Sequence, residues 1–167
     1  RIDEVINTKS SITDAESPKS ISNPKGLLVF DHVNFKYPGA NENALEDINF
    51  VAEPGKTTAI IRSTGCGKST LVNLIPRLYD ATEGSITLDG ENIKNISMKE
   101  LRDELGYVPQ KGILFSGTIE SNIKFGAPEA SMDIVKEAAE IAQATEFIET
   151  KSAKYESPIA QGGTNVS

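Results

Sequence analysis

The chain has 167 residues, a net charge of −7 and a sequence pI near 4.8, which suits one acidic globular domain. With 38% hydrophobic and 25% charged residues it is not a coiled coil, a collagen or a disordered tail. The acidic balance argues against a general nucleic-acid-binding surface, and the longest apolar runs, of four or five residues, are too short to cross a membrane.

The N-terminal part is polar and shows no clear period, so we interpret 1–25 as a linker and expect ordered structure from Gly26. Apolar residues in alternation predict a strand over 27–36, and we interpret 45–51 as another strand. The run 57–61 is entirely apolar or β-branched, which is typical of a strand buried on both faces.

A helix is predicted after this run, because apolar residues recur at i, i+3, i+4 and i+7 over 71–78. Pro76 lies inside the pattern, so a kink or an early last turn is expected. The alternating run 85–89 predicts a strand that ends at the turn pair Asp89-Gly90.

The last third of the chain begins with a helix signal. Ser97, followed three residues later by Glu100, predicts a capping box for a short helix that reaches Leu105. Tyr107-Val108 is a candidate for a short strand, and apolar spacing predicts a further helix over about 132–149.

The most informative stretch lies between the run 57–61 and the following helix. It reads Arg62-Ser63-Thr64-Gly65-Cys66-Gly67-Lys68-Ser69-Thr70, in the strand–loop–helix context of a phosphate-binding loop. Glycines let successive backbone N–H groups surround phosphate oxygens, and the start of the helix adds partial positive charge. Lys68 would supply a cation to the outer phosphates, and the Ser69 hydroxyl would bind Mg²⁺.

One position departs from the general pattern, which begins with glycine where this chain has Arg62. If the backbone needs a positive φ there, arginine strains it by about 1 kcal/mol; if φ is negative, Arg62 is harmless or adds positive charge. The sequence leaves both open. If Arg62 prevents nucleotide binding, the chain would be a structural or interaction module. A further alternative is that Gly-Lys-Ser occurs here by chance, as an ordinary turn that binds no phosphate. Cys66 is expected to be a small loop residue whose alkylation blocks nucleotide binding.

Four further segments accompany the loop in a fixed order. They are Phe35-Lys36-Tyr37-Pro38, Glu83 to Gly90, Leu105 to Gln110 and Leu114 to Ile123. Together these motifs resemble the ATP-binding domain of ABC transporters, of the exporter type in which membrane and ATPase domains share one chain. The resemblance covers about residues 26–167. The segment Phe-Ser-Gly-Thr-Ile after Gln110 is similar to the sequences of exporters rather than importers.

The resemblance implies an α/β fold with a P-loop NTPase core, an antiparallel β subdomain and the start of a helical subdomain. Residues 1–25 would be the linker from a preceding transmembrane domain. Residues 26–167 would be an ABC-type ATP-binding domain that stops before most of the signature motif, the Walker B strand and the switch histidine. Val166-Ser167 match the first two residues of that signature.

The resemblance also implies roles for single residues. Tyr37 matches the aromatic residue that stacks on adenine, and Gln110 matches the Q-loop glutamine that contacts Mg²⁺ and the attacking water. Gln110 is therefore the expected catalytic residue, and Ser69 and Gln110 are the expected metal contacts. The expected nucleotide contacts are Tyr37, Arg62, Ser63, Thr64, Gly65, Cys66, Gly67, Lys68, Ser69 and Thr70.

The function implied is that of the ATP-binding part of an ABC exporter ATPase, which couples ATP binding and hydrolysis to export across a membrane. The cofactors implied are ATP and Mg²⁺. The expected partners are a second ATP-binding domain, as homo- or heterodimer, and the transmembrane domain of the same transporter, with no nucleic acid. The expected location is the cytoplasmic face of the cell membrane, as part of a membrane protein.

Hydrolysis is expected of the parent protein, whereas these residues alone would bind ATP without hydrolysing it. The run Leu28 to Asp31 looks like a Walker B strand, but it precedes the loop and lacks a following glutamate. His32, the only histidine, is expected to be a structural or surface residue. The run Asp103 to Gly106 fits the D-x-x-G of GTPases, so a GTPase-type switch is a further alternative, although no Asn-Lys-x-Asp guanine motif exists.

Overall fold

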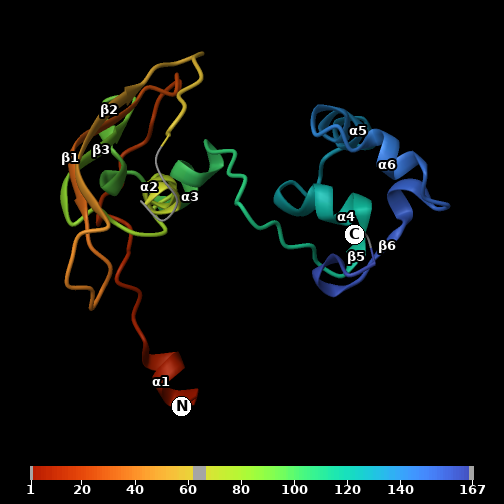
Figure 1. Ribbon diagram of the computed structural model, residues 1–167, viewed down its shortest axis with the longest axis horizontal. Helices are drawn as coiled ribbons and strands as arrows, with labels where there is room; N and C mark the ends of the chain where they lie inside the picture. Colours follow the sequence, from red (N-terminus) through yellow and green to blue (C-terminus); the bar gives the residue numbers. More distant parts are fainter. Residues whose placement is uncertain (1, 62–66, 166–167) are drawn as a thin grey trace. The chain divides into compact units, whose positions relative to one another are not determined.

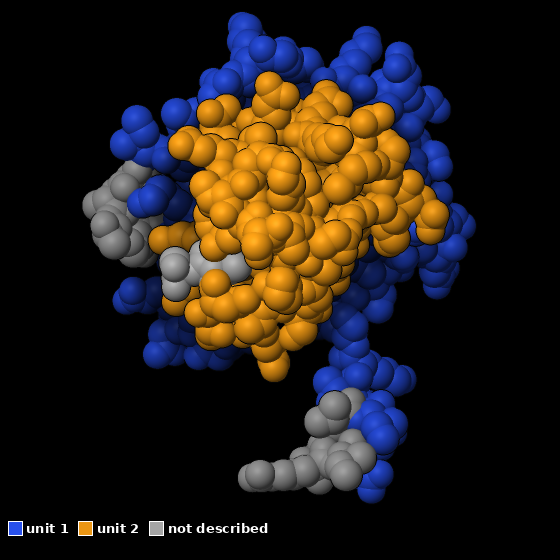
Figure 2. All heavy atoms as spheres, turned by 90° about the vertical axis from the view of Figure 1, so that its right-hand side faces the viewer, with its two compact units in different colours: residues 1–107 blue, residues 108–167 orange. Residues whose placement is uncertain are grey.

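The computed structural model describes residues 2–61 and 67–165, which belong to two compact units (Figures 1 and 2). Unit 1 is Arg1–Tyr107 and unit 2 is Val108–Ser167. None of the helices in the described ranges combines the length and the apolar character that a membrane crossing requires.

Unit 1 is built on a four-stranded antiparallel sheet in the order β2-β1-β3-β4. The strands are β1 (Leu28–Phe35), β2 (Leu45–Ala52), β3 (Glu83–Leu88) and β4 (Glu91–Asn92). The three longer strands confirm the predictions over 27–36, 45–51 and 85–89. Asp89 and Gly90 both have positive φ, as a two-residue hairpin between right-twisted strands requires.

Two helices of unit 1, α2 (Lys68–Leu74) and α3 (Met98–Asp103), pack one apolar side against this sheet. A third helix, α1 (Ile2–Asn7), contributes none of its described side chains to the core. As predicted, α2 ends early, just before Pro76, whose ring cannot continue the backbone hydrogen-bond ladder. The buried core that results is formed by Phe30, Val33, Phe35, Leu45, Leu71, Leu74, Ala81, Ile86, Leu88, Ile93, Ile96 and Leu101.

The predicted capping box at α3 is half formed. The Ser97 hydroxyl accepts a hydrogen bond from the Glu100 N–H, as expected. The Glu100 carboxylate, however, accepts its own hydrogen bond from the backbone N–H of Ile21. The helix ends at Asp103, two residues short of Leu105.

Two strand predictions are wrong. Residues 57–61 form no strand, and all five are exposed, Ile61 to 89%. A buried parallel strand needs hydrogen-bonding neighbours on its edges, and no strand of the described residues pairs with this run. Tyr107-Val108 forms no strand either, and Val108 is 93% exposed.

Unit 2 is mostly helical. The two-residue strands β5 (Gly117–Thr118) and β6 (Pro158–Ile159) pair antiparallel and flank α4 (Ile119–Ile123), α5 (Met132–Ile141) and α6 (Thr145–Glu149). The single helix predicted over 132–149 is therefore two helices, because the backbone reverses at Gln143, where φ is 57°. The buried residues of this unit are Ile119, Val135, Ala139, Ile148, Tyr155 and Ile159.

Strand β1, in the interior of the sheet, carries bulges at which polar residues are exposed to solvent. His32 and Asp47, on β1 and β2, both have positive φ, and the His32 Nδ1 atom lies 2.7 Å from the Asp47 carboxylate. This hydrogen bond, reinforced by the charges of Asp47 and Asp31, raises the pKa of His32 above 6.5. The same hydrogen bond, with help from Asn49, lowers the pKa of Asp47 below 3.8. His32 is thus a surface residue, as expected.

The stability of unit 1 should therefore depend on pH through this pair. Because its folded-state pKa is raised, His32 contributes stability below about pH 6.5, and the contribution is lost as pH rises through the raised pKa. The Asp47 contribution is present above its unfolded pKa and is lost as the solution becomes more acidic. We expect His32→Asn, which tolerates the positive φ, to destabilise the chain more at about pH 5.5 than at about pH 8.5. Denaturant unfolding at both pH values measures this, and an equal loss would contradict it.

Candidate functional site

The start of α2 carries the part of the predicted phosphate loop that can be described. Arg62, Ser63, Thr64, Gly65 and Cys66 lie outside the described residues, as do Val166 and Ser167. Gly67, Lys68, Ser69 and Thr70 form the helix cap and the first turn.

Gly67 is a position where the backbone requires glycine. Its φ is 80°, and a Cβ there would lie 2.7 Å from the Ala44 carbonyl oxygen and 3.0 Å from a methyl group of Leu45. The end of the loop is therefore pressed against the beginning of β2, with no room for a side chain. The glycine that the motif provides at this place has a structural reason in this chain.

The next three residues, 68–70, differ in how far their side chains are exposed to solvent. Thr70 is 7% exposed, whereas Ser69 is exposed and Lys68 is half-buried. Leu71 and Leu74 anchor the helix in the core one turn later. The polar residues that the motif assigns to phosphate and metal thus stand on a short helix whose opposite side is fixed.

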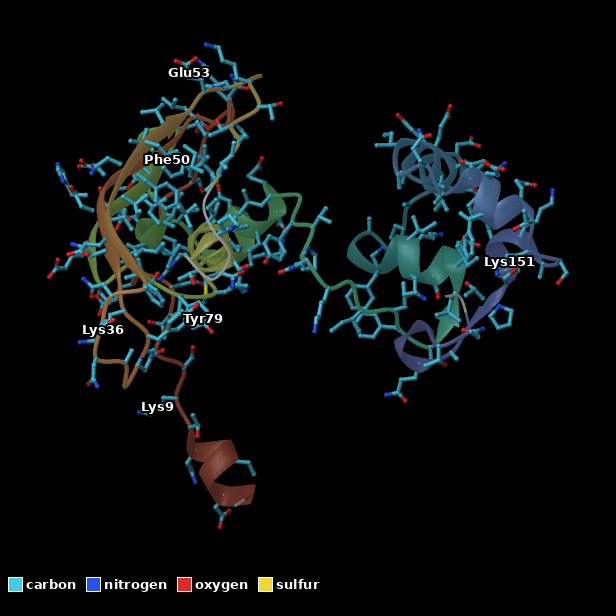
Figure 3. The ribbon with its side chains drawn as sticks, viewed as in Figure 1. Lys9, Lys36, Phe50, Glu53, Tyr79 and Lys151 are labelled. Atoms are coloured by element: carbon cyan, nitrogen blue, oxygen red, sulfur yellow. The ribbon has the colours of Figure 1, made fainter. Side chains whose placement is uncertain are left out.

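Tyr37 lies just beyond the end of β1 and is joined to this helix. Its hydroxyl is 2.8 Å from the Thr70 hydroxyl. Its ring makes edge contacts with Phe35 and with Tyr79, labelled in Figure 3, at centroid distances of 4.8 and 5.3 Å. The structure thus brings Tyr37, the residue predicted for adenine, next to Thr70, one of the predicted nucleotide contacts.

Gln110 belongs to unit 2 and lies in a stretch without regular structure. Its side chain is exposed, so the amide is open to a ligand. The pairing of Gln110 with Ser69 around one metal ion stays a prediction. Within the described ranges no three His, Cys, Asp or Glu side chains gather as a metal site, so Mg²⁺ here would depend on hydroxyl, amide, phosphate and water oxygens.

A hollow of about 230 Å³ opens beside the loop but does not suit a phosphate. Its wall combines β2 residues such as Leu45 and Phe50 with the exposed run around Ile60, and Lys68 is the one charged residue among the described residues that line it. A triphosphate needs several donors and cations, which this apolar wall does not supply.

Two features were not anticipated from the sequence. Arg77 is 3% exposed and holds Asp80 with two nitrogens, at 2.9 and 3.1 Å. In unit 2, Phe115 and Phe125 stack at 4.5 Å although they are 49% and 65% exposed. For the Arg77–Asp80 pair, the only sequence signal is an Arg–Asp spacing of three residues, which is too common to be informative. No sequence pattern indicates the stacking of Phe115 on Phe125.

The antiparallel sheet, the helix that follows a phosphate-loop sequence and the tyrosine bonded to that helix are consistent with the class of ABC nucleotide-binding domains. The family model described as "ABC transporter" matches residues 45–166, and the chain belongs to this family. The predicted resemblance and the antiparallel β layer are thereby confirmed.

Similar proteins agree with this assignment. The chain is 42% identical over 168 residues to the uncharacterized ABC transporter ATP-binding protein YfiB of Bacillus subtilis, covering 100% of the chain and 29% of that protein. It is 39% identical over 164 residues to a putative multidrug export ATP-binding/permease protein of Staphylococcus aureus, covering 98% of the chain and 28% of that protein.

Among solved structures, a bacterial Atm1-family ABC exporter with ATP bound matches with a TM-score of 0.91 and 32% identity, over 97% of the chain and 28% of the exporter chain. The chain thus spans less than a third of the length of these relatives.

Proposed function

We propose that this chain is the part of an ABC exporter that binds Mg-ATP, with the triphosphate held by residues 62–70 at the start of α2. The observation that carries the proposal is the junction of Gly67, Thr70 and Tyr37. The motif's glycine is sterically required there, and the hydroxyl of Thr70 holds the candidate adenine platform against the helix. A P-loop core is the fold that this junction supports.

The roles follow from the chemistry of each side chain. Lys68 neutralises the outer phosphates, and Ser69 binds Mg²⁺ with its hydroxyl. Tyr37 stacks on adenine, and Gln110 contacts the metal ion and the attacking water. The other nucleotide contacts proposed are Arg62, Ser63, Thr64, Gly65, Cys66, Gly67 and Thr70.

Export driven by ATP hydrolysis is the activity we propose for the whole protein. These 167 residues alone should bind ATP without hydrolysing it, since their sequence has no Walker B strand with a catalytic glutamate after the loop. Asp31 does not fill that role, because it lies on β1 at the bulge in the antiparallel sheet. Asp103 is the last residue of α3, and its exposed side chain forms an ion pair with Lys99. Because this carboxylate is engaged on the helix surface, the GTPase alternative is disfavoured.

The proposed partners are a second ATP-binding domain and the transmembrane domain of the same transporter, with the chain at the cytoplasmic face of the membrane. Support for a partner surface comes from unit 2. There the exposed, stacked rings of Phe115 and Phe125 lie near an apolar hollow of about 230 Å³ lined by Leu114, Ile119 and Phe147 among others. Paired exposed aromatic rings are typical of surfaces that another protein covers.

A titration with a fluorescent ATP analogue tests the proposal. We expect Tyr37→Ala to weaken Mg-ATP binding about tenfold or more, because it removes the stacking platform. Tyr37→Phe keeps the stacking ring but loses the bond to Thr70 that holds it against the helix, so its affinity should fall between those of the wild type and Tyr37→Ala. Equal competition by GTP would favour the switch alternative, and binding only after Arg62→Gly would favour a disabled site.

A further inference from the structure

Residues 13–21, which we call the docked strap, are bound to unit 1 although their composition is that of a linker. The Lys19 N–H donates to the Asn95 carbonyl oxygen at 2.8 Å, and the Ile21 N–H donates to Glu100 at 2.9 Å. Backbone groups make these bonds, which is why no apolar period marks the segment. Lys9 lies between α1 and the docked strap (Figure 3).

The docked strap also caps α3. The Asp14 carboxylate accepts a 2.7 Å hydrogen bond from the N–H of Met98, the first residue of that helix. This N–H has no partner within the helix, and a negative charge at a helix start is favourable. Asp14 therefore ties the strap to α3 by a charge-assisted bond.

A direct connection runs from the strap to α2 through Arg77. The Nη2 atom of Arg77 donates to the carbonyl oxygen of Thr13 at 3.2 Å, and the same guanidinium is held by Asp80. Arg77 stands three residues after the end of α2, with a φ of 52° that is uncommon outside glycine. Its buried side chain thus fixes the turn that follows α2 to the strap.

A second connection reaches the same turn through α3. Arg102 donates from Nε to the Pro76 carbonyl oxygen at 2.9 Å and from Nη2 to the Arg77 carbonyl oxygen at 3.2 Å. The strap holds the start of α3 by Asp14, and α3 holds the turn by Arg102. Both connections end at residues 76–77, and the seven-residue helix α2 joins that turn directly to the phosphate loop, which includes the first three residues of the helix.

We infer that docking of the strap and binding of nucleotide are thermodynamically linked through α2. The strap restrains the turn at the C-terminal end of the helix through the Arg77 and Arg102 hydrogen bonds, and a triphosphate at the loop would restrain its N-terminal end. Each event therefore lowers the conformational entropy that the other must still remove, which gives positive coupling that acts equally in both directions. The inference rests on the proposed function, since it takes the loop as the ATP site, and it makes Arg77 a positioning residue.

The test compares Asp14→Ala with Glu16→Ala in the intact protein. Glu16 is an exposed carboxylate of the same strap for which the described residues provide no hydrogen bond or ion pair, so it is the matched control. Asp14→Ala should speed amide hydrogen exchange over 13–21 and weaken Mg-ATP binding about fivefold or more. Glu16→Ala should change neither, and saturating Mg-ATP should slow strap exchange in the wild type.

Two results would overturn the linkage. One is a strap released by Asp14→Ala with ATP affinity unchanged. The other, which needs no variant, is wild-type strap exchange that saturating Mg-ATP leaves unaltered. Absence of ATP binding by the wild-type protein would instead refute the proposed function, so the two failures are distinguishable.

Discussion

Replacing Gly84 with alanine is expected to lower the free energy of unfolding of the chain by several kcal/mol, about 3 or more. Gly84 has a φ of 74° and stands on β3 opposite the bulge of β1. A Cβ at this position would lie 2.2 Å from the His32 carbonyl oxygen and 2.5 Å from that of Asp31. Both are backbone atoms of a central strand, so the clash is relieved only by opening the bulge.

Gly90→Ala is the matched control for Gly84→Ala. Gly90 has a φ of 86° in the hairpin between β3 and β4, but a Cβ there meets nothing within 4 Å. The expected loss is the cost of the left-handed backbone alone, about 1 kcal/mol. Denaturant unfolding followed by circular dichroism measures both variants. If both variants lose the same free energy of unfolding, the close approach of the β1 backbone to position 84 does not contribute to the cost.

Replacing Lys68 with alanine should lower the affinity for Mg-ATP by about 10- to 100-fold. A hydrogen bond between charged groups contributes about 1.5–3 kcal/mol, and each 1.4 kcal/mol is a factor of about ten in affinity. Lys68 is the lysine that the motif directs at the phosphates, and it sits in the first turn of α2. The fold should survive, because the helix is anchored by the buried Leu71 and Leu74.

Lys99→Ala is the control for the loss of a positive charge. Lys99 is an exposed residue of α3 in an i,i+4 ion pair with Asp103, and such surface pairs contribute little. Titration with the fluorescent ATP analogue should find its affinity at the wild-type level. If Lys68→Ala also binds at that level, the assignment of Lys68 to the phosphates is wrong.

Local patterns predicted the three longer strands of unit 1, and the family resemblance implied their antiparallel arrangement. Alternation marked β1 and β3, and the Asp89-Gly90 pair marked the turn after β3, because both signals depend on residues that are close in sequence. The early end of α2 was also predictable, because the ring of Pro76 alone prevents the helix from continuing. These elements need little information about distant neighbours.

The incorrect predictions concern elements that depend on tertiary contacts. The run 57–61 has the composition of a buried strand, but the described strands leave it unpaired, and pairing decides strand formation. Around Gln143 the helical period continues through a backbone reversal that spacing alone does not reveal. The docked strap is held by hydrogen bonds of its backbone and of side chains such as Asp14 to residues distant in sequence, for which the amino-acid sequence has no pattern.

In the candidate site, too, some features could be predicted from local sequence and others depend on tertiary contacts. The motif predicts phosphate contacts within 62–70, and these stay a prediction. The structure adds why Gly67 must be glycine and how Tyr37 reaches Thr70. The role of Arg77 could not be predicted, because it joins three segments that are distant in sequence.

The most direct test of ATP binding at the phosphate loop uses Cys66, the only cysteine of these 167 residues. The measurement is the rate at which a thiol reagent alkylates the Cys66 peptide, with and without saturating Mg-ATP. A triphosphate bound by residues 62–70 should cover this position, so we predict that Mg-ATP slows alkylation strongly and that the effect is lost in Lys68→Ala. Equal rates in the presence and absence of Mg-ATP would contradict the proposed site.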